Sequence, residues 1–144
     1  MKKITMLSLI VALISFAACG QKMDASKLPV KVKAAFDQKH PGMSAKWDKE
    51  DANYEASFKM DKHDMSELYD ENGNLQETEM DISIAELPAS VMDYIKAHYA
   101  GEKVKEAAKI TKADGKMMYE AEVKGIDVLF DENGNFIKEV KDED

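Results

Sequence analysis

The stretch LYDENGNL at residues 68–75 recurs as LFDENGNF at residues 129–136, and these two stretches decide the fold of the chain. In each, an Asn-Gly pair separates two runs of β-type residues. The two pairs are Asn72-Gly73 and Asn133-Gly134. Asn-Gly between such runs is a strong short-range signal for a β-hairpin, because both residues tolerate positive φ. We therefore predict structural turns at both pairs.

The similarity extends upstream of both stretches. Leu28-Pro29, Val32 and Phe36 recur in the same order and spacing as Leu87-Pro88, Val91 and Ile95. Apolar residues four positions apart form one stripe of an α-helix. A proline opens each segment and a glycine follows it, as is typical of helix boundaries. Each copy is therefore predicted to begin with a helix of about three turns, with its apolar stripe buried.

Strands are predicted between each helix and its Asn-Gly turn. Residues 54–58 and residues 119–123 alternate apolar and polar side chains, the period of a half-buried antiparallel strand. Weaker strand signals lie near residues 46–49 and 104–110. The sequence thus predicts an α+β fold of two tandem helix-plus-four-strand repeats, residues 28–83 and 84–144. About eight antiparallel strands would carry two helices on one face and leave the other face partly open.

The two copies differ by insertions. The second has extra residues before its Tyr119 strand, and the first has extra residues between its Tyr54 strand and its Asn-Gly turn. The latter fall around Asp61, Lys62, His63 and Asp64. We expect them to form a longer, more exposed hairpin tip than Lys124-Gly125 in the second copy.

The first 18 residues read as a lipoprotein signal peptide. Two lysines at positions 2 and 3 precede a short apolar run that is too short to span a bilayer. Cys19, the sole cysteine of the chain, directly follows Phe16-Ala17-Ala18 and resembles the lipidated cysteine of a bacterial lipobox, although Leu is usual where Phe16 stands. The alternative is an ordinary secretory signal with an unpaired cysteine. Residues 19–27 are expected to be the lipidated cysteine and a polar tether.

The charge of the chain limits its partners. The sequence has 28 acidic residues and a formal net charge of −8, and none of its basic residues is arginine. Removal of residues 1–18 takes away two lysines and leaves −10. Because phosphate and base recognition rely on arginine, a nucleic-acid binder is not expected. We expect membrane contact through the lipid anchor only, and a protein or peptide partner with a cationic surface.

The helix spacing, the Tyr-Glu-Ala strands and the Asp-Glu-Asn-Gly-Asn turns together resemble the PepSY-like, β-lactamase-inhibitor-like proteins of bacterial envelopes. The resemblance covers residues 28–140. It implies a tandem repeat of a helix on a four-stranded antiparallel sheet, with a concave, saddle-like surface like that of the β-lactamase inhibitory protein. It implies no activity, because most members of the family have no established activity and no inhibitory motif maps onto this sequence.

Candidate ligand sites are few. Met60, His63 and Met65 lie close together in the sequence, and thioether and imidazole groups suit copper(I). Methionine is more often a flexible core residue, so the structural interpretation is favoured over the metal site. The two Asp-Glu-Asn-Gly-Asn segments resemble calcium loops only superficially, because an EF-hand loop lies between helices.

No catalytic set is identifiable. The sequence offers no Ser/His/Asp triad. It also offers no Cys/His dyad, because Cys19 is expected to be acylated. His40 and His98 stand at the predicted helix ends, where a cation interacts favourably with the helix dipole. The abundant carboxylates alternate with lysines along strands and are interpreted as solvated faces. We therefore expect a protein without enzymatic activity and without a cofactor.

The preferred hypothesis is an envelope module that binds a protein or peptide partner. The partner would contact the open sheet face and the tip formed by Asp61, Lys62, His63 and Asp64, in the manner of an inhibitor. The alternative is a metal or small-ligand sensing module that uses Met60, His63 and Met65. An enzyme is the third and weakest hypothesis.

Overall fold

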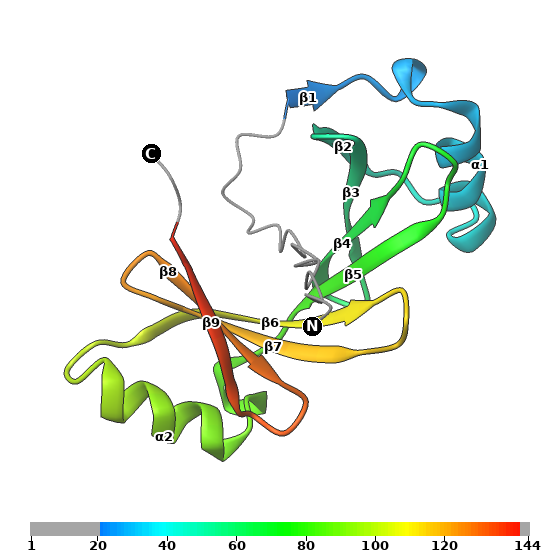
Figure 1. The fold of residues 1–144 in the computed structure, drawn as a ribbon. Coiled ribbons are helices and arrows are strands. Elements are labelled where there is room, and N and C mark those ends of the chain that lie inside the picture. The colour runs from blue at the N-terminus through cyan, green and yellow to red at the C-terminus, as the bar shows by residue number, and fades with distance from the viewer. Residues whose placement is uncertain (1–20, 142–144) are drawn as a thin grey trace, which may run out of the picture.

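The computed structural model describes residues 21–141 and shows two helices on a nine-stranded antiparallel sheet (Figure 1). The strands lie in the sheet in their chain order, so each is hydrogen-bonded to the next. The elements are β1 (Gln21–Met23), a 3₁₀ turn (Ala25–Lys27), α1 (Val30–Lys39), β2 (Lys46–Glu50), β3 (Asn53–Met60), β4 (His63–Tyr69), β5 (Leu75–Asp81), a 3₁₀ turn (Ile84–Glu86), α2 (Ala89–His98), β6 (Val104–Lys112), β7 (Met117–Val123), β8 (Ile126–Asp131) and β9 (Phe136–Lys141). The α+β class is as predicted.

The sheet has one strand more than the eight expected. The additional strand is β1, which pairs with the edge of β2 and places Met23 opposite Trp47. Met23 also packs against the core under α1. A segment expected as tether is thus ordered from Gln21, because pairing satisfies backbone groups that β2 would otherwise expose at the sheet edge.

The predicted signal peptide and Cys19 lie outside the described residues. Between residues 21 and 141, neither helix has the length and apolar character needed to cross a membrane.

Both helices form where their apolar stripes predict them. Val32 and Phe36 are the buried residues of α1, and Val91 and Ile95 are those of α2. Each helix begins directly after a proline, which has the extended conformation at the N-cap. Each helix is therefore held mainly by one apolar stripe that faces the sheet.

Cross-strand register shows that α1 and α2 cover the same face of the sheet. Met80 of β5 packs against the α1 core and lies opposite Lys109 of β6. Lys109 in turn lies opposite Tyr119 of β7, which packs against the α2 core. Directly opposed residues of antiparallel strands share a face. The two helices lie at opposite ends of the sheet in Figure 1, each over its own strands.

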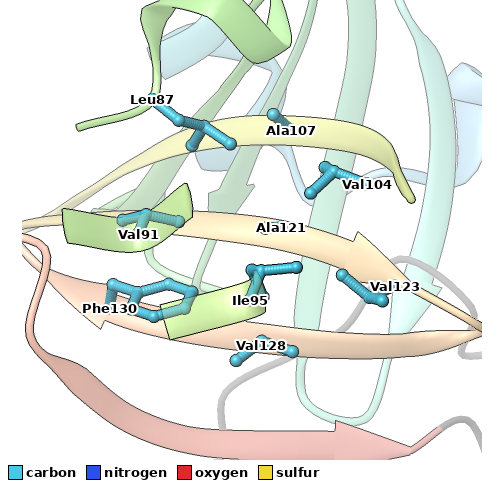
Figure 2. Close-up of a cluster of buried hydrophobic side chains, with 9 residues drawn as sticks. All are labelled: Leu87, Val91, Ile95, Val104, Ala107, Ala121, Val123, Val128 and Phe130. Atoms are coloured by element: carbon cyan, nitrogen blue, oxygen red, sulfur yellow. The ribbon is translucent and has the colours of Figure 1, made fainter. Parts of the chain in front are cut away.

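The core under α2 is made almost entirely of aliphatic side chains. Figure 2 shows Leu87, Val91 and Ile95 directed at the side chains of β6, β7 and β8. Val91, Ala121, Val123, Val128 and Phe130 have no exposed area at all. Burial of such groups stabilises by about 25 cal/mol for each Å² of apolar surface removed from water.

The core under α1 differs because it contains a buried carboxylate. Glu67 is 1% exposed, and its oxygens accept hydrogen bonds from Lys39 Nζ (2.6 Å) and the Tyr69 hydroxyl. His40 Nε2 lies 3.0 Å from the same carboxylate. Three partners satisfy a charge that would otherwise be costly to bury.

The turns at residues 70–74 and 131–135 join β4 to β5 and β8 to β9, where hairpins were predicted. The Gly73 N–H donates to the Asp70 carbonyl (3.0 Å), and the Asp70 carboxylate accepts from the backbone N–H groups of Asn72 and Asn74. Of each Asn-Gly pair, only the glycine has positive φ (81° at Gly73, 77° at Gly134). Asn72 and Asn133 need no positive φ, because this is a turn with a glycine bulge and not a two-residue hairpin loop.

Each of these glycines touches the start of a helix. A Cβ atom at Gly73 would lie 2.5 Å from the Lys31 carbonyl oxygen, and a Cβ atom at Gly134 would overlap Ser90 Oγ. The turns therefore position the helices as well as reverse the chain, because only a residue without a side chain permits this contact.

Replacement of Gly73 by alanine should lower the free energy of unfolding by more than about 2 kcal/mol, because strained φ and a clash with helix backbone combine. Gly115→Ala is the matched control. Gly115 has φ of 83° and open space where its Cβ would lie, so it isolates the φ strain, about 1 kcal/mol. Urea denaturation measures both, and equal losses would show that the helix–turn contact contributes nothing.

Candidate functional site

A groove of about 730 Å³ runs over the sheet face that the helices leave uncovered. It crosses the junction of β5 and β6, so strands from both halves of the chain line it. Small side chains on this face create the hollow. They are Ser57, Ser66 and Ala108, of which Ser57 and Ser66 lie directly opposite each other. Longer side chains on neighbouring rows form the walls.

The walls of the groove are strongly acidic. Two lysines line it, Lys46 and Lys59, and Lys59 Nζ is already paired with Asp64 at 2.9 Å. Against them stand seven carboxylates, Asp64, Glu79, Asp81, Glu106, Glu120, Glu122 and Asp127. Like charges this close repel one another, and a cation entering the groove relieves that repulsion.

Glu79 is the most deeply buried carboxylate of the groove, with 5% of its surface exposed. It lies opposite Ser66 of β4 on one side and Ile110 of β6 on the other. Burial raises the pKa of Glu79 well above its usual range, and the nearby charges of Glu120, Asp81, Glu55 and Asp127 raise it further. The fold therefore holds this carboxylate where its ionised form is costly.

Asp81 extends this acidic region toward the hairpin tip. Burial raises the pKa of Asp81, and the charges of Asp64 and Glu106 add to the effect. A continuous acidic surface thus crosses the β5–β6 junction. It is formed by Asp81, by Glu79 on the same face of β5, and by Glu106 on β6.

A second carboxyl pair lies further along the same face. Burial and the neighbouring Glu55 raise the pKa of Glu50 to about 8, and burial also raises the pKa of Glu55. Glu50 Oε2 is fully buried and has no hydrogen-bond partner. The arrangement fits a protonated Glu50 that donates to an ionised Glu55, which also accepts from Ser66.

Glu77 shows how the fold treats a buried carboxylate that serves structure. It lies two residues before Glu79, on the same face of β5, and is directly opposite Lys112 of β6. The Lys112 ammonium donates to the Glu77 carboxylate. This ion pair spans the junction of the two halves and leaves neither charge unsatisfied.

The predicted tip residues occupy two different environments. Asp61 and Lys62 form a tight two-residue turn with φ of 51° and 72°, whereas His63 and Asp64 belong to β4. The inserted residues thus lengthen the β3–β4 hairpin and do not form a loop. Asp64 lies on the groove face and lines its rim, so one member of the predicted tip reaches the groove.

The predicted metal residues lie on the helix face of the sheet. Met60 is opposite His63, and Met65 is opposite Phe58 in the core under α1. Met65 is 9% exposed, and His63 Nδ1 lies 2.9 Å from the Asp81 carbonyl oxygen. Within residues 21–141, no three His, Cys, Asp or Glu side chains are grouped so as to hold a metal ion.

The histidines at the helix ends have separate surroundings. His40 follows the last turn of α1, where its backbone N–H donates to the Phe36 carbonyl and its ring approaches Glu67. His98 ends α2 and stacks on Tyr94 with ring centroids 4.1 Å apart.

Sequence reasoning did not find Glu79, Asp81, Glu106 or Glu120, because it assigned the carboxylates to solvated strand faces. The alternation Glu77, Glu79, Asp81 in β5 and Glu120, Glu122 in β7 was visible. What was missing was the pairing of β5 with β6, which brings these rows together.

Comparisons with known proteins agree with this fold. The model of a family described as "Putative beta-lactamase-inhibitor-like, PepSY-like" matches residues 17–77 and residues 52–138. A "putative periplasmic" protein of Bacteroides eggerthii has 18% identity and a TM-score of 0.71, over 78% of this chain and 88% of that one. A DUF2874 family protein of Bacteroides uniformis has 21% identity and a TM-score of 0.69, over 78% and 88%. A BLIP-like protein of Bacteroides fragilis has 22% identity and a TM-score of 0.61, over 79% and 87%. No curated protein matches the sequence significantly.

The Glu50–Glu55 pair makes stability depend on pH. The pKa of Glu50 is about 8 in the folded protein and 4.5 ordinarily, so the folded state keeps a proton that the unfolded state releases. The free energy of unfolding should therefore fall as pH rises between these values. Glu50→Gln has a side chain that stays neutral at every pH. Near pH 8 its free energy of unfolding should exceed that of the wild type by about 1 kcal/mol or more, because a shift of one pKa unit corresponds to about 1.4 kcal/mol.

Urea denaturation at about pH 5 and about pH 8 measures this dependence. Glu132→Gln, an exposed carboxylate in the β8–β9 turn, is the matched control and should keep the slope of the wild type. If the free energy of unfolding of Glu50→Gln depended on pH as steeply as that of the wild type, the assignment of the proton to this pair would be contradicted.

Proposed function

Because the chain belongs to the PepSY-like, β-lactamase-inhibitor-like family, we propose that it is a non-enzymatic envelope lipoprotein that binds a cationic protein or peptide in the groove of its open sheet face. The observation that carries this proposal is the excess of seven carboxylates over two lysines around that groove. A negative surface steers a cationic partner toward it and disfavours partners of its own sign.

The shape of the site supports binding of a partner segment. A groove of about 730 Å³ is large enough for several side chains, and it lies on a sheet that two helices support from behind. A surface supported in this way changes little on binding, which limits the entropic cost of association. The family description and the BLIP-like neighbour favour an inhibitor-like role, in which the long β3–β4 hairpin enters a cleft of the partner.

The proposal includes the repeat. Residues 28–83 and residues 84–144 are two PepSY-like repeats whose paired sheets form a saddle, and the groove is the hollow of that saddle. Both the internal sequence identity and the recurring order of 3₁₀ turn, helix and four strands support this.

A lipid on Cys19 would hold the domain at a membrane of the bacterial envelope. The sequence around Cys19 supports this, and the description of the Bacteroides eggerthii neighbour as periplasmic agrees. Because β1 begins at Gln21, the anchor would be close to the sheet edge. Mass spectrometry of the native protein should find an acylated N-terminal Cys19, and an unmodified thiol would refute the anchor.

A metal sensor receives less support from the same structure. Met60 and Met65 both pack against the core under α1, which is the role methionine commonly has in proteins.

Charge reversal at the groove tests the proposed function. Glu106 and Glu122 lie at its rim, and Glu106→Lys with Glu122→Lys should abolish capture of the cationic partner from solubilised envelopes. Asp93→Lys with Glu132→Lys makes the same charge change on α2 and on the β8–β9 turn, and it should leave capture intact. Equal capture by both variants would contradict binding in the groove.

The same experiment separates the groove from the hairpin tip. Asp61→Ala with Asp64→Ala should leave the melting temperature within a few degrees, because both side chains are exposed. Loss of capture would place the tip in the binding surface. Unchanged capture, together with loss in the Glu106→Lys, Glu122→Lys variant, would restrict binding to the groove.

A further inference from the structure

Glu79 differs from the buried carboxylates Glu67 and Glu77, which both have hydrogen-bond donors. It is 5% exposed and lines the groove, yet among residues 21–141 it has neither a hydrogen-bond donor nor an ion-pair partner. Glu67, which is 1% exposed, is satisfied by Lys39, His40 and Tyr69. A buried carboxylate without a partner is costly, and such groups in native proteins call for an explanation.

The comparison with Glu77 shows what Glu79 lacks. Both side chains project from the same face of β5, and the residue opposite each on β6 is known from the register. Glu77 faces Lys112, which donates to it, whereas Glu79 faces Ile110. The fold thus supplies a cation to one carboxylate and an apolar surface to the next.

Resting on the proposed function, we propose that Glu79 is the anchor of the groove and binds the cationic group of one lysine or arginine side chain of the partner. The partner's cation would reach Glu79 from the groove that this carboxylate lines. Its aliphatic stem would lie along the groove beside Ala108, as the stems of long basic side chains commonly lie on apolar surface.

The surroundings of Glu79 favour an organic cation over a metal ion. A metal ion needs several ligands in a closed arrangement, and residues 21–141 hold no suitable group of three or more His, Cys, Asp or Glu side chains. An ammonium or guanidinium group needs only hydrogen-bond acceptors on one side, which Glu79 and the neighbouring Ser66 hydroxyl provide. The surrounding carboxylates Asp81 and Glu120 add attraction at longer range.

Calorimetric titration with short end-blocked peptides tests the anchor. The probes are a trilysine peptide, a triarginine peptide and a trinorleucine peptide of the same length. The protein should bind at least one of the two cationic peptides and not the neutral one. Tighter binding of trilysine would identify an ammonium as the preferred group, and tighter binding of triarginine a guanidinium.

Glu79→Gln keeps the size of the side chain and removes its charge. It should weaken binding of the preferred peptide by about tenfold or more, with no fall in melting temperature. Glu122→Gln removes the same charge from the groove rim and should weaken binding by less than about threefold.

The outcomes separate the two proposals. Equal weakening by Glu79→Gln and Glu122→Gln would overturn the anchor and leave the acidic groove as the binding site. Absence of binding of either cationic peptide to the wild-type protein would overturn both.

Discussion

The pairing of β5 with β6 is the interaction on which the rest of this structure depends. Residues 77–81 pair with residues 108–112, and this ladder joins the strands under α1 to the strands under α2. Without it, β5 and β6 would each be an exposed sheet edge, and each half alone would be of a size at which burial is marginal. The same ladder places the acidic rows of both halves on one surface. Its Glu77–Lys112 ion pair offsets part of the repulsion that this juxtaposition creates.

The two halves use one backbone plan with different interiors. Where the first half buries Glu67 and Tyr69, the second has Val128 and Phe130 at the matching positions, and its core is aliphatic. A buried carboxylate with three partners adds little net stability over an apolar core of similar volume, but it fixes the geometry of the groups around it. The polar network thus ties the end of α1, through Lys39 and His40, to the middle of β4. This is the strand that carries Ser66 and Asp64 on the opposite face.

The sequence predicted the helices and strands of this fold better than the tertiary contacts between them. Apolar stripes at Val32, Phe36, Val91 and Ile95 specified the helices, because a helix of this length buries one face only. The glycine turns were also predicted, although not that Gly73 and Gly134 contact helix starts, which is a tertiary property. β1 was missed because its three residues, of which Met23 alone is apolar, are too few to show a strand period. The groove was missed because a strand with alternating carboxylates has the same sequence pattern whether those carboxylates face water or lie beside carboxylates of another strand. Only the β5–β6 register distinguishes these cases.

The pattern of partners argues against a merely solvated acidic face. On such a face, carboxylates would be exposed and interleaved with lysines, as Lys59 and Asp64 are at 75% and 59% exposure. The open face of this sheet departs from this, because Glu79 in the groove and Glu50 further along the face are buried, and burial raises the pKa of both. Retaining ionisable groups at such positions lowers stability, and natural proteins accept that cost mainly where the group has a task. The Lys112 opposite Glu77 shows that this sheet can place a lysine beside a buried carboxylate. No lysine is opposite Glu79, where Ile110 stands instead, and this difference favours a role for Glu79 other than ion pairing within the sheet. A carboxylate that is buried, faces a groove and awaits a cation is better suited to recognition than to holding the sheet together.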